Sequence, residues 1–263
     1  MLTSPGEIAF IIGPAAIHYY GLIMALSLLL GVIIANRICN KFYKELNPEI
    51  IYDIAPHIII GAIIGARAYY CLMSATYYIK NPGEIIQLWH GGLSIHGAII
   101  GGLILGIIYA KRHKLPILKL CDIFSYGLVL GQALGRWGNF FNSEAFGCPT
   151  ENFLKLYIPV YKRPIEYLGV NYFHPTFLYE SVLDVCIFLI LFFIVRKLTK
   201  NKDGIIFFSY LILYSIVRIL VEQIRIDSIL NILGIPIAQI MSVIIILISI
   251  GAIFRINIKN KVM

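Results

Sequence analysis

The chain has 263 residues, of which 59% are hydrophobic and only 14% are charged, and its formal net charge is +8. A mean hydropathy of +0.82, with apolar stretches of about 20 residues, excludes an ordinary soluble domain and a disordered chain. A coiled coil is excluded because the charged residues that flank its seam are missing. The pattern also lacks the short alternating strands of a transmembrane β-barrel. The composition therefore indicates a polytopic helical membrane protein.

Seven apolar stretches are long enough to cross the ~30 Å hydrocarbon core of a bilayer as helices. In chain order they lie at about residues 17–38, 54–73, 93–110, 117–135, 177–195, 205–221 and 236–254. Helices are expected because a helix satisfies its own backbone groups in lipid. The sequence therefore predicts an all-α polytopic membrane protein, with residues 1–263 forming a single integral membrane domain of seven transmembrane helices.

The basic residues predict how the chain is oriented. Fourteen of the 22 lysines and arginines follow the first, third, fifth and seventh stretches, and five lie in the alternate loops. The other three, Arg67, Arg136 and Arg218, lie inside the stretches or at their rims. Because Lys and Arg collect in cytoplasmic loops, we expect the N-terminus outside and the C-terminus in the cytoplasm. The same rule accounts for the net positive charge, so nucleic acid is not expected as a partner.

The loop at residues 137–176 is much longer than the others and contains four prolines. Long connections of this kind usually carry structure of their own. We therefore expect a small extracytoplasmic head between the fourth and fifth spans.

Glycines recur at four-residue spacing within the predicted spans. Small residues at this spacing allow helix backbones to approach closely. We expect such contacts at Gly61 and Gly65, at Gly97 and Gly101, and at Gly127, Gly131 and Gly135.

Residues 135–147 form the most polar stretch beside a span. Glycines at 135, 138 and 147 are expected to permit tight backbone turns. A guanidinium held by amides and a carboxylate would suit a phosphate group, although a helix cap with an Arg–Glu pair would give the same pattern. The candidate binding residues are Arg136, Asn139, Asn142, Glu144 and Gly147.

The end of the sixth span carries a second polar group. Tyr214, Arg218, Glu222 and Arg225 are spaced to share one helix face. Two arginines beside one acid have a net positive charge, which favours an anionic ligand. A self-satisfied ion pair between helices is the alternative.

Other polar residues lie near the same end of the predicted spans. His96 begins the third span after Gly-Gly-Leu-Ser and could serve as a general base, although a lone histidine at a helix start is often structural. Weaker candidates are Tyr20, Arg67, the segment His174–Glu180 and Asp184.

On the predicted topology most of these polar residues lie toward the outer face. A polar chamber that opens to lipid suits an anionic phospholipid better than a soluble substrate. A transferase and a transporter for an anionic lipid or solute both fit this arrangement. A transporter usually shows repeated halves and interrupted helices, and the sequence shows no repeat.

The motifs resemble one family in order and spacing. They include Gly135-Arg136-x-Gly138-Asn139-Phe140-x-Asn142-x-Glu144, Gly-Gly-Leu-Ser-x-His96-Gly, His174-Pro-Thr-x-Leu-Tyr-Glu180 and Tyr214-x-x-x-Arg218-x-x-x-Glu222. This long, gapped signature is similar to that of the bacterial prolipoprotein diacylglyceryl transferases, and the resemblance covers residues from about 18 to 254.

The resemblance implies a reaction, its partners and a location. The diacylglyceryl group of phosphatidylglycerol would move to the lipobox cysteine of a preprolipoprotein signal peptide, and glycerol 1-phosphate would leave. His96 matches the proposed base, while Arg136 and Arg218 match the headgroup-binding arginines. The enzyme would act among membrane lipids in the bacterial inner membrane, and no cofactor or metal is implied. Other matching substrate-binding positions are Tyr20, Asn139, Asn142, Glu144, Gly147, Tyr214 and Glu222.

Overall fold

The structure, a computed structural model, describes residues 1–199, 202–226, 231–232 and 234–262. In this part of the chain seven helices are long and apolar enough to cross a membrane. The predicted all-α fold with seven transmembrane helices is therefore confirmed. The helices are α1 (Tyr19–Phe42), α2 (Ile50–Met73), α4 (Ile95–Arg112), α5 (Ile117–Phe141), α6 (Thr176–Ile190, continuing to Leu198), α8 (Ile205–Glu222) and α9 (Ile237–Val262).

Short elements connect the long helices. The helix α6 continues through a π-helical turn at Leu191–Val195 into α7 (Arg196–Leu198). Near α2, the short helix α3 spans Ala75–Tyr78, and 3₁₀ turns lie at Pro82–Ile86 and Leu88–His90, with further turns at Val160–Lys162 and Ile165–Tyr167. The strands are β1 (Leu2–Thr3), β2 (Ile8–Ile12), β3 (Ala15–His18), β4 (Leu156–Tyr157), β5 (Tyr172–Phe173), β6 (Asn231–Ile232) and β7 (Ile235–Pro236).

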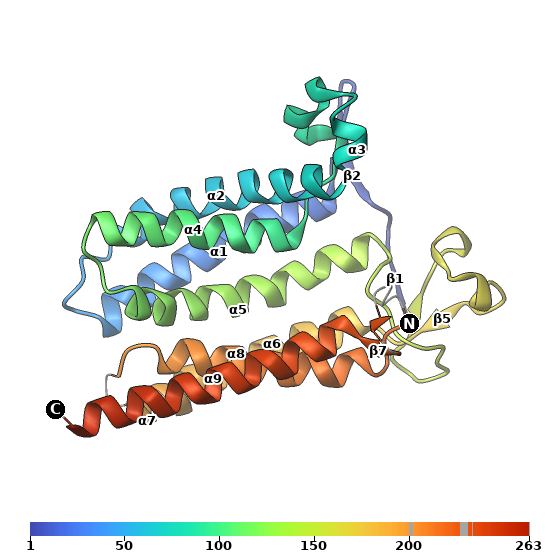
Figure 1. The fold of residues 1–263 in the computed structure, drawn as a ribbon. Coiled ribbons are helices and arrows are strands. Elements are labelled where there is room, and N and C mark those ends of the chain that lie inside the picture. Colours follow the sequence, from blue (N-terminus) through green and yellow to red (C-terminus); the bar gives the residue numbers. More distant parts are fainter. Residues whose placement is uncertain (200–201, 227–230, 233, 263) are drawn as a thin grey trace. The chain divides into compact units, whose positions relative to one another are not determined.

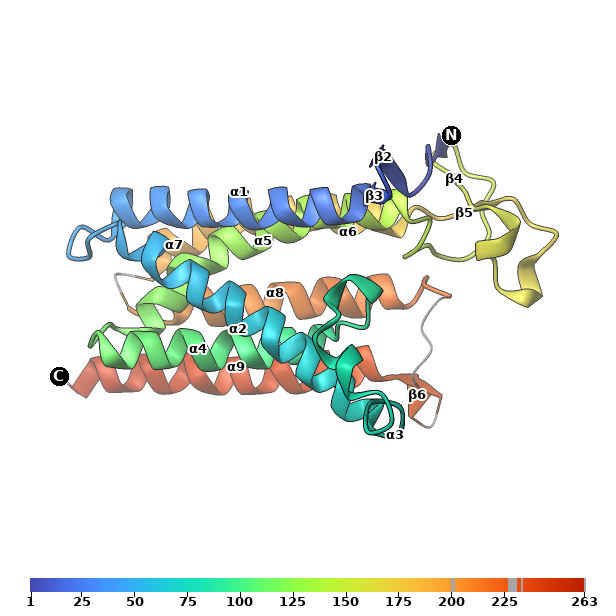
Figure 2. The same cartoon turned by 90° about the horizontal axis from the view of Figure 1, so that it is seen from above.

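The chain divides into two compact units, each of which is described by itself (Figure 1). The first unit contains Met1–Ala35 and Cys121–Met263, and the second contains Asn36–Leu120. The helices α8 and α9 run side by side within the first unit (Figure 2).

The second unit is built on close contact between α2 and α4. A Cβ atom added at Gly101 would lie 2.1 Å from the carbonyl oxygen of Gly61. One added at Gly97 would lie 2.2 Å from the carbonyl oxygen of Gly65. The predicted glycine contact is therefore confirmed, because any side chain at these positions would force the two backbones apart.

The first unit also has a close glycine contact between two helices, and a side chain from α5 caps the start of α8. A Cβ atom added at Gly127 of α5 would lie 2.1 Å from the carbonyl oxygen of Gly31 of α1. At the start of α8, the backbone N–H groups of Gly204 and Phe207 donate to the carboxylate of Asp122, at 2.6 and 2.7 Å. Asp122 of α5 therefore satisfies amides that a helix leaves unpaired at its first turn.

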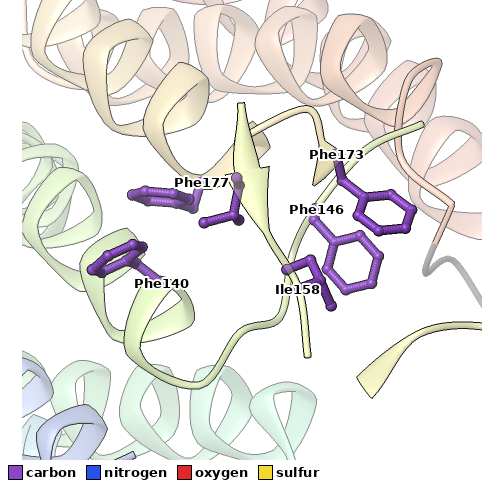
Figure 3. Close-up of a cluster of buried hydrophobic side chains, with 6 residues drawn as sticks. Phe140, Phe146, Ile158, Phe173 and Phe177 are labelled. Carbon is purple, nitrogen blue, oxygen red and sulfur yellow. The ribbon is translucent and has the colours of Figure 1, made fainter. Parts of the chain in front are cut away.

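Residues 142–175, between α5 and α6, surround a small apolar core (Figure 3). Strand β4 pairs antiparallel with β5, and β1 from the N-terminus adds to β4 in parallel. The Lys162 ammonium lies 2.6 Å from Glu7, and this hydrogen bond raises the pKa of Lys162 above its ordinary value. The segment thus has packing of its own, and its placement outside the membrane stays a prediction. The buried core residues are Phe140, Phe146, Leu156, Ile158, Phe173 and Phe177.

The fourth span ends later than predicted. Helix α5 continues to Phe141, and the expectation that Gly135 and Gly138 form turns is wrong. Gly138 is instead needed for close packing, because a Cβ atom there would lie 2.9 Å from the ring of Tyr20, whereas one at Gly135 would meet nothing nearer than 3.7 Å. The chain turns afterwards, where Ser143 and Ala145 adopt φ angles of 51° and 55°.

Gly101→Ala should destabilise the protein because its new methyl group overlaps the α2 backbone. Overpacking of this kind costs about 1–3 kcal/mol or more. Gly251→Ala in α9 is the matched control, since a Cβ atom there meets nothing within 4 Å. Thermal unfolding in detergent should show a clearly lower Tm for Gly101→Ala and little change for Gly251→Ala. Equal Tm values for the two variants would contradict the backbone contact.

Candidate functional site

The central feature of the first unit is the carboxylate of Glu180. This residue lies on α6, and only 3% of its side chain is exposed. The guanidinium of Arg136 on α5 forms an ion pair with it. Nη1 of Arg218 on α8 and Nη1 of Arg225 lie 3.5 and 3.3 Å from its Oε1. One buried acid therefore gathers three guanidinium groups from different parts of the chain.

A second carboxylate completes this group. The Oε2 atom of Glu222 lies 2.7 Å from Nη2 of Arg218, one turn away on α8, as the four-residue spacing predicts. We call Arg136, Arg218, Arg225, Glu180 and Glu222 the guanidinium cluster. Its three positive and two negative groups leave a formal charge of +1.

Tyr214 joins the cluster to a neighbouring pair of polar side chains. Arg136 donates a hydrogen bond of 3.2 Å to the Tyr214 hydroxyl. The Tyr210 hydroxyl, one turn earlier on α8, donates to Gln132 of α5 at 2.9 Å. These contacts hold α5 and α8 together at the level of the cluster.

Glu144 has partners different from those that the sequence pattern indicated. Its Oε1 atom accepts hydrogen bonds from the side-chain amides of Asn139 at 2.8 Å and Asn142 at 3.3 Å. The interpretation that these amides and Glu144 hold Arg136 is wrong, because Arg136 pairs with Glu180 on α6.

The backbone around Gly147 supports the cluster. Gly147 forms an antiparallel bridge with Arg225, and the N–H of Cys148 donates to the Ile224 carbonyl at 2.7 Å. A Cβ atom at Gly147 would lie 2.8 Å from that same carbonyl oxygen. Gly147 therefore lets the chain approach closely enough to position Arg225, which is a packing role and not the turn that we expected.

Asp184 lies one turn beyond Glu180 on α6 and is fully buried. Neither of its carboxylate oxygens has a hydrogen-bond partner among the described residues. Asp184 therefore makes no hydrogen bond to a neighbouring helix in that part of the chain, although its carboxylate interacts electrostatically with Arg136 of α5.

His96 and Arg67 belong to the second unit. His96 lies in the first turn of α4 and is exposed, with its ring centroid 6.0 Å from that of Tyr69 on α2. Arg67 is buried and donates to backbone carbonyls of residues 84–92. Arg67 thus serves the local structure, unlike the arginines of the guanidinium cluster.

From the sequence, Glu180 was only one of the weaker candidates for the site. One signal could have identified it as a stronger candidate, because two arginines beside the single acid Glu222 require a further counter-charge nearby. An acid inside an apolar span is itself costly and marks a functional position. Among the described residues no group of three or more His, Cys, Asp or Glu side chains could hold a metal ion.

Comparisons with known proteins agree with the motifs. The family described as "Prolipoprotein diacylglyceryl transferase" matches residues 7–255. A Synechococcus elongatus protein is 44% identical over 247 residues, covering 92% of this chain and 84% of its own. A Thermosynechococcus vestitus protein is 39% identical over 262 residues, covering 98% and 95%. Both are named phosphatidylglycerol–prolipoprotein diacylglyceryl transferase. The chain therefore belongs to the prolipoprotein diacylglyceryl transferase family.

Proposed function

We propose that this protein transfers the diacylglyceryl group of phosphatidylglycerol to the lipobox cysteine thiol of a preprolipoprotein. The relatives' names supply the donor lipid and the acceptor protein, and they favour a transferase over a lipid transporter. The lipobox cysteine enters because a thiol is the nucleophile that this resemblance implies.

The guanidinium cluster is the observation that carries the proposal. A phosphodiester has one negative charge, which would neutralise the formal +1 of the cluster. Arg136 and Arg218 bind the headgroup phosphate, because the planar guanidinium fork matches two phosphate oxygens. Glu180 holds both arginines in place before the lipid arrives, so the site is preorganised for the anion.

The remaining polar residues line the headgroup site in this proposal. The Tyr214 hydroxyl orients Arg136, and Glu222 orients Arg218, through the contacts described above. Tyr20, which packs on Gly138, and the Glu144 group with Asn139 and Asn142 contact the rest of the lipid. Gly147 keeps Arg225 near Glu180.

The chemical step is a substitution at a glycerol carbon. His96 takes the proton from the cysteine thiol, because the thiolate is the reactive nucleophile. The sulfur forms a C–S bond to the terminal glycerol carbon of the diacylglyceryl group, and the C–O bond to phosphate breaks. The electron pair leaves with the phosphate as glycerol 1-phosphate. Arg136 and Arg218 stabilise the charge that grows on this leaving group.

The site faces the outer side of the bacterial inner membrane in this proposal. The support is the asymmetry of 14 basic residues against five in the loops. The N-terminus and residues 142–175 then lie outside, and the C-terminus lies in the cytoplasm. Labelling of residues 150–170 by an impermeant reagent added outside is the direct check.

The reaction is tested with the purified protein, phosphatidylglycerol and a lipobox peptide. Mass spectrometry should detect a diacylglyceryl thioether on the peptide cysteine and free glycerol phosphate. Replacing the peptide cysteine by serine should abolish the adduct. Lipid binding without any adduct would favour a transporter instead.

Arg136→Lys and Arg218→Lys should each lose about 10²-fold or more of the transferase activity, because an ammonium cannot make the two-oxygen contact. Arg255→Lys is the control, since Arg255 is exposed on α9. The initial rate of adduct formation is measured at matched folded protein. Near wild-type rates in both lysine variants would rule out the headgroup clamp.

Glu180→Gln should reduce both stability and activity. Removing one partner of a buried ion pair costs about 3–5 kcal/mol, and here it leaves three guanidinium groups beside one carboxylate. Glu166→Gln, at an exposed position in a 3₁₀ turn, serves as the control. The Tm and the rate of adduct formation should both fall for Glu180→Gln and stay unchanged for Glu166→Gln. A fully stable and active Glu180→Gln protein would refute the central role of this acid.

His96→Gln should slow the chemical step by about 10²–10⁴-fold while phosphatidylglycerol still binds. Raising the pH toward the thiol's own pKa should recover part of the loss, because more thiolate is then present without a base. The measurement is a pH–rate profile beside a lipid-binding assay. An equal loss at every pH together with weaker lipid binding would make His96 a binding or structural residue.

A further inference from the structure

Asp184 is a buried acid beside the guanidinium cluster that the proposed reaction leaves unused. It lies on α6 one turn after Glu180, and its side chain is 0% exposed. Neither of its carboxylate oxygens has a hydrogen-bond partner among the described residues. An acid inside a membrane span is costly and marks a functional position. The absence of a donor for Asp184 therefore requires an explanation.

The polar side chains around Asp184 are engaged with other partners. The carboxylate interacts electrostatically with Arg136 of α5, but the guanidinium of Arg136 pairs with Glu180. Asp184 also interacts electrostatically with Tyr210 of α8, whose hydroxyl donates to Gln132 at 2.9 Å. Asp184 is thus close to these groups without a hydrogen bond from either of them.

The charges that face Asp184 act in opposite directions. Arg136 attracts a negative charge at this position, whereas Glu180 on the same helix repels it. Tyr210 is neutral while it donates its hydroxyl proton to Gln132. A small change in the charge of the site therefore decides whether Asp184 is an anion or a neutral acid.

The formal charge of the site changes when an anion binds. The guanidinium cluster has a formal charge of +1 from three guanidinium groups and two carboxylates. An ionised Asp184 brings the total of the empty site to zero. A phosphodiester adds one more negative charge, so two anions then compete for one net positive charge. A buried charge without compensation is usually neutralised by a proton.

We propose that Asp184 takes up one proton when a phosphodiester headgroup binds to the guanidinium cluster. The inference rests on the proposed function, which places the phosphate of phosphatidylglycerol at Arg136 and Arg218. The proton comes from the solution and forms an O–H bond on the Asp184 carboxylate. Glu180 and Glu222 stay ionised, because both are paired with guanidinium groups. The anion therefore enters without leaving a net charge buried in the membrane.

Proton binding and lipid binding then strengthen each other. A phosphodiester has no second acidic proton, so its own charge does not change near neutral pH. Because linkage is reciprocal, the Kd for the lipid should rise about tenfold per pH unit wherever the empty site is deprotonated and the lipid-bound site is protonated. The affinity of the site for its donor lipid would thus depend on pH before any thiol is present.

The proposal is tested by counting protons in a calorimeter. Short-chain phosphatidylglycerol is titrated into the purified protein in detergent, without a lipobox peptide, in buffers that have different ionisation enthalpies. The dependence of the binding heat on the ionisation enthalpy of the buffer gives the number of protons taken up per lipid. The maximal uptake by the wild-type protein, in a scan from about pH 5 to about pH 8, should be close to one proton per lipid.

Asp184→Asn separates the proton from the rest of the site, because an amide has the size of the neutral acid and does not titrate in this range. This variant should take up no proton, and its Kd for phosphatidylglycerol should change less than about twofold over the same pH range. Asp53→Asn, at an exposed position on α2, is the matched control and should behave as the wild type does. Equal proton uptake by Asp184→Asn and the wild type would assign the proton to another group, such as His96, and would overturn the proposal.

Failure of this proposal differs from failure of the proposed function. Phosphatidylglycerol that binds to the wild-type protein without proton uptake at any pH would refute the role of Asp184 and leave the transferase proposal intact. No binding of phosphatidylglycerol at any pH would remove the headgroup site, and both proposals with it. If Asp184→Asn does not fold, the proton count of the wild-type protein decides alone.

Discussion

The fold of the first unit depends on one buried carboxylate. Charged groups inside a membrane protein are stable only when they are paired. Glu180 provides this pairing for guanidinium groups from α5, from α8 and from the chain after α8. Removing these charges from water is costly, so the three guanidinium groups stay buried there only because Glu180 and Glu222 pair with them.

Two sets of arginines in the described part of the chain have different kinds of partner. Arg67 and Arg163 are buried and donate to backbone carbonyls, Arg163 to those of Ile158 and Leu168. Such arginines stabilise irregular segments. Arg136 and Arg218 instead pair with carboxylates, and our proposal assigns phosphate binding to these two arginines.

Local patterns in the sequence predicted those structural features that depend on residues close together in the chain. The seven apolar stretches, the glycine spacing within α2 and within α4, and the Arg218–Glu222 pair each depend only on residues that lie within one helix. The pairing of Arg136 with Glu180 and the strand pairing of Leu2 with Leu156 join residues far apart in the chain, and no periodicity encodes them. Gly138 was misread because a glycine that packs against a ring and a glycine that makes a turn look alike in a sequence.

The Asp122 cap at the start of α8 links the two leaflets of the membrane. Fourteen residues separate Gly204 from Arg218, and a rise of about 1.5 Å per residue makes this distance about 21 Å along the helix. A helix is stiff along its axis, so fixing its first turn also fixes the depth of every side chain above it. A carboxylate near one end of α8 therefore sets the height of Arg218 near the other end, and the two positions are expected to evolve together although their side chains never meet.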